Sequence, residues 1–367
     1  MSEYGEHVPA YRKVRVVAHE DAPAAALADV EAWEARERYP DLMSGGGPLF
    51  AVVQELESGG WEMLTRADAT PQSARDSMTA IFRKRAEEVA LAGDTAGQQD
   101  LLATAELLDW ERHDDLTVAG VRYRVARAEP FIRMGPDGPE GPRPSDPDPA
   151  PVGKSHEFRS PTRGFVIDPF AGTGLSESIL RLELLGLVRK AGTVPHEVRS
   201  DSQLAKHSHP GGVLLPAEFV TAECVNGHWQ PTAGPSETPQ GARDALAMYL
   251  RVMAPVLERL DDDERAEYAR IADRLDAERC DELEIGGKPT RIVRVERLVR
   301  VGPDGPEGPR PSDPDPDPPA ALQAQQLREQ GVNLDDDEED DPSPETKELI
   351  HLFEQERKRQ EKLAEGS

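Results

Sequence analysis

Two long stretches of the chain show the same succession of apolar and polar positions. In the first, residues 49–53 and 61–64 are rich in apolar side chains and flank a glycine-containing turn, which predicts a β-hairpin. In the second, residues 219–224 and the segment at Trp229 predict a matching hairpin. The hydrophobic pattern therefore indicates a structural unit that occurs twice.

Helices are predicted after each of these hairpins. Thr70 and Thr238 each precede a proline, and an N-cap residue followed by proline is a typical helix start. Residues 98–112 and 263–280 predict a second helix in each unit. In the second unit, the first helix has apolar residues at spacings of three and four, which form one stripe: Leu246, Tyr249, Leu250, Met253, Val256 and Leu257.

Each unit ends in a predicted strand that is rich in arginine. Residues 283–285 turn through two glycines into a strand over 290–301, and Gly120 leads into a strand over 121–134. Two interpretations stay open: the guanidinium groups bind an anionic ligand, or they pair with the chain's own carboxylates. We favour pairing, because their spacing puts them on both faces of a strand. The arginines are Arg122, Arg124, Arg127, Arg133, Arg291, Arg294, Arg297 and Arg300.

The clearest sign of a duplication is an identical tract, GPDGPEGPRPSDPDP, at residues 135–149 and again at 302–316. Helices grouped between hairpins favour an α+β fold. We therefore predict a tandem, pseudo-symmetric duplication of a hairpin–helix–helix–hairpin unit, with extra residues in the second copy around 188–208. The expected divisions are repeat unit 1 (1–134), a proline-rich strap or linker (135–163), repeat unit 2 (164–301), a proline-rich strap with an acidic linker (302–342) and a C-terminal helix (343–367).

The repeated tract is expected to be extended, because its prolines fix φ and remove hydrogen-bond donors. One interpretation is a structural strap, which costs little entropy to order because the proline dihedrals are preset. A second interpretation is a ligand for an aromatic groove on a partner, presented twice. A third is a recent copying event between the two halves of the chain. We favour the strap, with several proline rings buried and with Arg143 and Arg310 in equivalent settings.

The amino-acid composition limits the classes of molecule that the protein is expected to bind. The net charge is −27, from 70 acidic and 43 basic residues, so direct binding to nucleic acid is disfavoured and a basic protein partner is favoured. The sequence contains no run of 18 apolar residues, so no membrane-spanning helix is expected, and the N-terminus lacks the apolar region of a secretory signal. Two cysteines give no disulfide framework. A cytoplasmic protein is expected, and its oligomeric state is left open.

One segment resembles a cofactor loop. Residues 165–174, FVIDPFAGTG, are similar to the DPFxGxG loop of amino-group DNA methyltransferases, whose glycines approach S-adenosylmethionine. The second signature of those enzymes, an Asn/Asp/Ser-Pro-Pro-aromatic tetrad, is absent from the sequence. Residues 16–23 match this segment in the first copy and contain no glycine. A simple strand–turn–helix explains the segment as well, and we expect Gly172 and Gly174 to contact no cofactor.

A cluster of histidines suggests metal binding only weakly. The second copy contains, within a short stretch, His196, His207, His209, Cys224 and His228. Their spacing does not follow the paired pattern of zinc ligands, so a polar loop is the favoured interpretation. Cys280 takes the place of His113 in the first copy, which suggests a packing position.

The C-terminal region combines an acidic run with a helix. Seven consecutive acids over 335–341 predict a disordered tail, and Ser343-Pro344 starts a helix with a short apolar stripe. This helix could dock on a partner or fold back on the body. Both alternatives stay open.

With RxGPDGPEGPRPSDPDP doubled and TPQxARD upstream of each copy, the chain resembles a family of uncharacterised actinobacterial proteins, a domain of unknown function. That resemblance implies no activity, cofactor or catalytic residue. The chain shows no convergent acid, base, nucleophile or phosphate loop, so we expect no catalytic, cofactor-binding or metal-ligating residue. The leading hypothesis is a non-catalytic interaction or regulatory protein. The alternatives are a binder or enzyme of a small anionic molecule, using the arginine strands, and an S-adenosylmethionine-dependent methyltransferase.

Overall fold

The structure, a computed structural model, describes residues 14–17, 22–333 and 343–365. The first half contains α1 (Pro23–Arg38), β1 (Asp41–Ser44), β2 (Leu49–Glu55), β3 (Trp61–Met63), α2 (Pro71–Leu91), α3 (Thr95–Trp110), β4 (Asp115–Val118), β5 (Val121–Gly135) and β6 (Gly138–Pro139). A 3-10 turn (Ser155–Glu157), β7 (Val166–Ile167), α4 (Leu175–Gly186) and α5 (His196–Ser208) follow. The second half contains β8 (Gly211–Val225), β9 (His228–Pro231), α6 (Pro239–Met248), a π-helical segment (Tyr249–Met253), α7 (Ala254–Leu257), α8 (Asp262–Glu278), β10 (Glu282–Ile285), β11 (Lys288–Gly302) and β12 (Gly305–Pro306), and the chain ends in α9 (Ala320–Glu329) and α10 (Pro344–Glu365).

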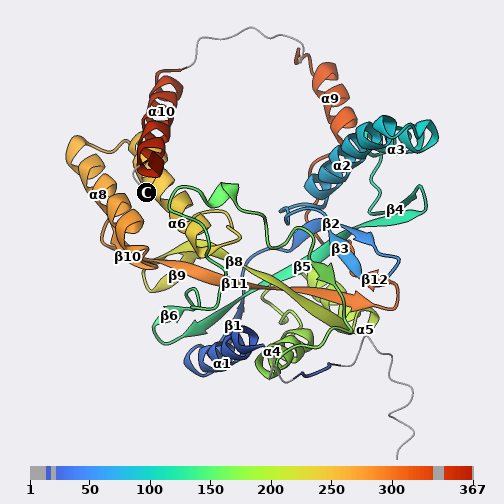
Figure 1. Cartoon of the computed structure of the whole chain (residues 1–367), viewed down its shortest axis with the longest axis horizontal. Coiled ribbons are helices and arrows are strands. Elements are labelled where there is room, and N and C mark those ends of the chain that lie inside the picture. The colour runs from blue at the N-terminus through green and yellow to red at the C-terminus, as the bar shows by residue number, and fades with distance from the viewer. Residues whose placement is uncertain (1–13, 18–21, 334–342, 366–367) are drawn as a thin grey trace, which may run out of the picture.

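The centre of the molecule is a curled antiparallel sheet to which both halves contribute (Figure 1). Its strands follow the order β7-β3-β2-β5-β11-β8-β9. The long strands β5 and β11 pair in the middle, with Glu129 opposite Leu298. Helices α2 and α3 lie at one end of the sheet, and α6 and α8 lie at the other (Figure 1). The predicted α+β class is confirmed.

The predicted hairpins and helix starts are confirmed. β2 pairs with β3, and β8 pairs with β9, at the two expected hairpins. The Thr70 side chain accepts a hydrogen bond from the Ser73 N–H at 3.2 Å, and the Thr238 side chain accepts one from the Gly241 N–H at 3.0 Å. These caps satisfy backbone donors that the first turn of a helix leaves unpaired. Each helix therefore begins where its threonine predicts.

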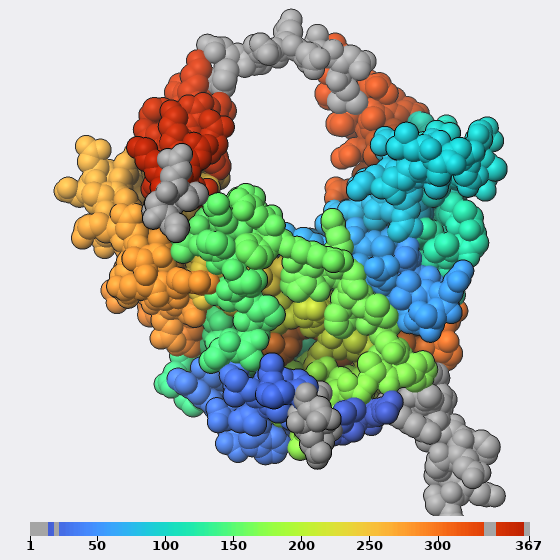
Figure 2. Space-filling model, viewed as in Figure 1, coloured from blue at the N-terminus to red at the C-terminus, as the bar shows by residue number. Residues whose placement is uncertain are grey.

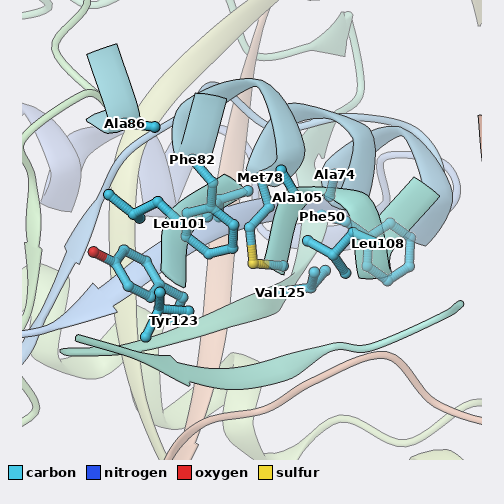
Figure 3. Packing of buried hydrophobic residues seen from close by; sticks show 12 residues of the cluster. Phe50, Ala74, Met78, Phe82, Ala86, Leu101, Ala105, Leu108, Tyr123 and Val125 are labelled. Carbon is cyan, nitrogen blue, oxygen red and sulfur yellow. The ribbon is translucent and has the colours of Figure 1, made fainter. Parts of the chain in front are cut away.

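Helices α2 and α3 are held on the sheet by the core of the first half (Figure 3). Met78 and Phe82 of α2 are fully buried and belong to the same cluster as Leu101 of α3 and Phe50 of β2. The rings of Phe82 and Tyr123 meet edge to face, with centroids 4.9 Å apart. Each large apolar side chain buried in this way contributes about 1.5–3 kcal/mol. The packing fixes the helix pair over β2 and β5.

The apolar stripe predicted on the first helix of the second half is interrupted. Residues 249–253 are π-helical, and the N–H of Ala254 donates to the carbonyl of Tyr249, five residues earlier. Pro255 accounts for this, because it has no N–H and its ring excludes the carbonyl four residues before it. The extra residue turns the stripe, so Tyr249 and Leu257 are exposed. The predicted stripe was wrong at these two positions.

The two proline tracts cross to opposite halves of the molecule. Gly138 of the first tract lies against the indole of Trp229, and Gly305 of the second lies against the indole of Trp61. A Cβ on Gly138 would lie 2.7 Å from Nε1 of Trp229, and one on Gly305 would lie 2.6 Å from Nε1 of Trp61. We call residues 138–149 the first strap and residues 305–316 the second strap.

Hydrogen bonds, more than buried rings, hold the straps. The carbonyl of Pro139 accepts from Arg291 Nη1 at 2.7 Å, and the carbonyl of Pro306 accepts from Arg124 Nη1 at 2.8 Å. The side chain of Asp148 accepts from Arg243 Nη1 at 2.8 Å. Pro139 and Pro306 are buried, whereas the other prolines over 136–144 and 303–311 are half-buried or exposed: Pro136, Pro142, Pro144, Pro303, Pro309 and Pro311. The expectation of several buried rings was wrong, because the polar backbone of the straps makes the contacts.

The C-terminal helices lie on different halves (Figure 1). α9 packs on α3, and α10 packs on the π-helical segment and on α7. Glu356 of α10 is 5% exposed and pairs with Arg359 at 2.8 Å and with Arg251 at 3.5 Å. The helix therefore folds back on the body, one of the two alternatives. The acidic run over 335–341 lies outside the described residues.

Candidate functional site

A cavity of about 580 Å³ opens beside the central sheet, between α1, α4, the first strap and β8. Figure 2 shows the hollow between α1, in blue, and the green segments above it. Its volume is in the range of small-molecule sites. Part of the wall is apolar and includes Phe165, Leu180 and Leu215, and the polar part includes Arg133, Arg143, Arg181 and Arg294.

One wall of the cavity is a cluster of ion pairs between the first strap and β11. Arg143 Nε donates to Glu140 Oε1 at 2.6 Å, and its Nη2 donates to Glu296 Oε1 at 3.3 Å. Arg294 pairs with Glu296 and donates to Asp146 Oδ1 at 3.0 Å. Burial alone would raise the pKa of Glu296, but the charges of Arg294 and Arg143 lower it. These arginines are therefore occupied by carboxylates of the chain.

An equivalent cluster joins the second strap to β5. Arg127 Nη1 donates to Glu129 Oε1 at 2.8 Å, and Arg310 Nη1 donates to the same oxygen at 2.9 Å. Arg310 Nε also donates to Glu307 Oε1 at 2.7 Å. Burial would raise the pKa of Glu129, but the charges of Arg127 and Arg310 lower it to about 2. Arg143 and Arg310 thus have equivalent settings, each beside a strap glutamate and a glutamate of the central strands.

Most of the other strand arginines are also paired, which supports the interpretation favoured from sequence. Arg122 pairs with Asp115 at 2.8 Å, Arg291 with Glu282 at 2.8 Å, and Arg297 with Glu218 at 2.7 Å. These pairs join neighbouring strands, β4 to β5, β10 to β11 and β8 to β11.

Arg133 and Arg300, both 2% exposed, depart from this pattern. Arg300 Nη2 donates to the carbonyl of Leu185, at the end of α4, at 3.2 Å. Arg133 has only long contacts, 3.5 Å to the carbonyl of Tyr39 and 3.9 Å to a carboxylate oxygen of Glu183. Burial lowers the pKa of both arginines. Of the two, Arg133 lines the cavity.

Helix α4 adds an arginine that the sequence analysis missed. Arg181 is 2% exposed, lines the cavity, and has a buried Nε without a hydrogen-bond partner. In the part of the chain that the structure describes, it makes no hydrogen bond or close ion pair. Burial lowers its pKa, and the charge of Glu177 opposes this only in part. The available signal was an arginine within residues 179–185, where Glu183 is the other charged residue among five apolar ones.

The glycine turn that resembles a cofactor loop is filled by the chain itself. Gly172 lies against the side chain of Val17, and Gly174 lies against the carboxylate of Asp29, so closely that a Cβ at either glycine would collide. The N–H of Ser176, in the first turn of α4, donates to Asp29 Oδ1 at 2.8 Å. The space next to these two α-carbons is therefore occupied by Val17 and Asp29, while residues 171–174 of the same turn also line the cavity.

Comparison with protein families places the molecule. A family model described as a family of unknown function, DUF5954, matches residues 22–357. The chain belongs to the DUF5954 family. No curated protein and no solved structure matches it. The match runs from α1 into α10, so both halves, both straps and the cavity lie within the DUF5954 region.

In this DUF5954 chain, α1 and α5 contact the straps in the same way. The N–H of Ser145 in the first strap donates to Glu31 of α1 at 2.9 Å, and the N–H of Ser312 in the second strap donates to Asp201 of α5 at 3.0 Å. α5 lies within residues 188–208, where extra residues are expected in the second copy. Val16 and Thr173, from the segments 16–23 and 165–174, form a parallel bridge. Of the first of these segments, residues 18–21 lie outside the described part.

The histidines considered as metal ligands are separate from the cavity. Among the described residues, no group of three or more His, Cys, Asp or Glu side chains is placed to hold a metal ion. His207 Nδ1 lies 2.8 Å from the carbonyl of Gln203, one turn earlier in α5. Burial raises the pKa of the Cys280 thiol, which packs on the core of the second half, as a packing position would. Of the helices described, none combines the length and apolar character needed to cross a bilayer.

Proposed function

We propose that this DUF5954 protein acts by binding and not by catalysis, as an interaction or regulatory protein. The crossed straps carry the proposal. They use the arginines and carboxylates of the central strands to join the two halves into one body, which leaves those groups little freedom for chemistry.

The cavity wall supports the same proposal. Among the described residues, its lining contains no histidine or cysteine. Of its six carboxylates, Asp146, Glu296 and Glu237 pair with arginines, Asp29 accepts from the N–H of Ser176, Asp168 accepts from the N–H of Phe170, and Glu177 acts on Arg181 through its charge. A general acid or base needs a group poised near neutral pKa and free to reach the substrate. The wall is better suited to holding a molecule than to transforming it.

The proposal includes a tandem duplication. The same order of strands and helices occurs on each side of the β5–β11 pair, and the contacts of Gly138 with Trp229 and of Gly305 with Trp61 are reciprocal. We therefore regard the molecule as two related units that exchange their straps, with Trp61 and Trp229 in equivalent places.

The partner we propose is a basic protein, because a net charge of −27 attracts positive surfaces and repels phosphates. We place the interaction in the cytoplasm, where the two free cysteines, Cys224 and Cys280, would stay reduced. The arrangement of α9 and α10 on different halves offers each half a surface that the C-terminal region could release or cover.

A pull-down with the tagged full chain tests this proposal. The full chain, a chain ending at residue 316, and an unrelated acidic protein of similar net charge are compared by quantitative mass spectrometry. We expect one protein to be enriched by the full chain over the acidic control, with altered recovery on the truncated chain. Equal recovery of every protein on the full chain and the acidic control would refute the interaction role.

A second candidate function is the binding of a small anionic molecule, the alternative that the arginine-rich strands suggest. Arg133 and Arg181 favour it, since both are buried in the wall of one cavity and the Nε of each has no hydrogen-bond partner.

A further inference from the structure

The cavity contains a charge arrangement that structural pairing leaves unexplained. Arg181 and Arg133 are both 2% exposed and both line it. The Nε atoms of both are buried and have no hydrogen-bond partner. By contrast, Arg143 and Arg294 in the same wall are tied to strap and strand carboxylates. Arg181 forms no ion pair with a described carboxylate, and Arg133 has only the long contact with Glu183, at 3.9 Å.

Such an arrangement is costly for the protein alone. A buried charge without a partner loses its hydration and gains nothing in return, and it is normally paired or hydrogen-bonded. Arginine cannot escape by losing its proton in a protein. A bound anion would supply the missing acceptors, and forked guanidinium groups match the geometry of a carboxylate or phosphate.

The remaining charges of the wall do not fill that role. Glu296 and Asp146 pair with Arg143 and Arg294, although the charges of Glu140 and Glu296 also raise the pKa of Arg133. Glu237 pairs with Arg66 at 3.2 Å. Asp29 and Asp168 accept hydrogen bonds from the backbone N–H groups of Ser176 and Phe170. The charge of Glu177 raises the pKa of Arg181 and offsets only part of the effect of burial.

The rest of the cavity lining indicates the chemical character of the remainder of the ligand. Phe165, Leu180, Val213 and Leu215 contribute apolar surface next to the arginines, and three alanines of α1 close the opposite side. An apolar wall with a few placed polar groups is typical of small-molecule sites. The ligand that fits has one oxyanion and a mainly apolar skeleton.

We propose that this cavity binds a small organic anion, a carboxylate or a phosphate monoester, whose oxygens accept hydrogen bonds from Arg181 and Arg133 while its apolar body lies on Phe165 and Leu215. This inference rests on the second candidate function and deepens it by naming the site and the ligand class. It is independent of the protein partner: failure of the site would leave the pull-down result unchanged.

Three probes of similar size test the site on the full chain: benzoate, phenyl phosphate and the neutral benzamide. Each is titrated by calorimetry and by thermal shift in a buffer without phosphate or carboxylate. At least one of the two anions is expected to bind and to raise Tm, and benzamide is expected to do neither. The comparison of benzoate with phenyl phosphate identifies which oxyanion the arginines prefer. If neither anion exceeds benzamide, the proposal is wrong.

Variants assign the binding to the cavity. Arg181→Met and Arg133→Met should each lower the affinity for the anion at least tenfold, because each substitution removes a charged hydrogen-bond donor. Arg300→Met is the matched control, since Arg300 is the equivalent strand arginine and lies outside the cavity wall. Unaltered anion affinity in Arg181→Met, or an equal loss in Arg300→Met, would overturn the proposal.

The ligand-free stability of Arg181→Met separates a binding role from a structural one. If the Arg181 guanidinium finds its acceptors only in the complex with a ligand, replacing it by an apolar side chain should leave the ligand-free Tm unchanged or raise it. A lower ligand-free Tm would instead assign Arg181 to the fold and contradict the inference. If Arg181→Met does not fold, Arg181→Lys replaces it and keeps the charge. This variant should bind the anion more weakly than wild type does, but more tightly than it binds benzamide.

Discussion

The buried carboxylate of Glu129 allows the contribution of a crossed strap to be measured directly. It is 7% exposed and accepts hydrogen bonds from Arg127 of its own strand and from Arg310 of the second strap, at 2.8 and 2.9 Å. Burial alone would raise its pKa, but the two arginines lower it to about 2 from an ordinary value of 4.5. Glu129→Gln keeps the shape of the side chain and removes its charge.

The size of the effect follows from the pKa. A difference between 4.5 and about 2 corresponds to about 3 kcal/mol of stability at pH 7. Because the pKa is lower in the folded state, this contribution is complete above the unfolded-state pKa and is lost as the pH falls toward the folded-state pKa. It should amount to only about 1 kcal/mol near pH 3. The free energy of unfolding of Glu129→Gln should therefore be lower than that of wild type by about 3 kcal/mol at pH 7 and by much less at pH 3.

Urea unfolding at both pH values, followed by tryptophan fluorescence, measures the difference. Glu88→Gln, on the exposed side of α2, is the control and should change the free energy of unfolding little at either pH. A loss in Glu129→Gln that is equal at pH 7 and pH 3 would show that charge is not the cause. A loss below about 1 kcal/mol at pH 7 would refute the reasoning that the strap arginine depends on this carboxylate.

Other perturbations test the straps and the C-terminal helix. Replacing residues 138–146 by a glycine–serine segment of equal length should lower the free energy of unfolding by on the order of 5 kcal/mol, because it removes partners of several buried arginines; an unchanged urea midpoint would exclude the strap role. Gly138→Ala should lower Tm more than Gly59→Ala, since both glycines have positive φ but only Gly138 faces an indole; equal losses would argue against close packing on the tryptophan. Glu356→Gln removes a buried charge facing Arg251, so trypsin should cleave α10 faster, and wild-type protection would contradict this attachment.

Sequence signals predicted the fold well where one residue decides the local backbone. Thr70 and Thr238, each followed by proline, marked helix starts that the structure reproduces, because cap and proline act within one turn. Pro255 was equally visible in the sequence. Which side chains of the helix face the core, however, depends on the π-helical segment that precedes this proline. The direction of the apolar stripe was therefore missed.

The crossing of the straps could not be predicted, because the two tracts and the two surfaces that bind them are equivalent in sequence. Arg124 and Arg291 offer equivalent donors to the two straps, and the straps themselves are identical. A sequence with two equal tracts and two equal docking surfaces does not say whether each tract binds its own unit or the other. Arg181 was missed for a different reason: an arginine in an apolar run reads as an exposed residue until the helix is packed.

The exchange of straps has a consequence for the order in which the chain is made. Arg124 and Arg127 of the first half find their strap partners only in residues 304–313, which leave the ribosome long after the first half has been synthesised. Until then, Arg124 has only Asp115 and Arg127 only Glu129 as an anionic partner in the described part of the first half, and the N-terminal half lacks part of its final ion pairs. Contacts of such large sequence separation slow folding and prolong the lifetime of incomplete states. A prematurely terminated chain that lacks the second strap should therefore be recognised as unfinished and degraded, although more than three-quarters of its residues are present.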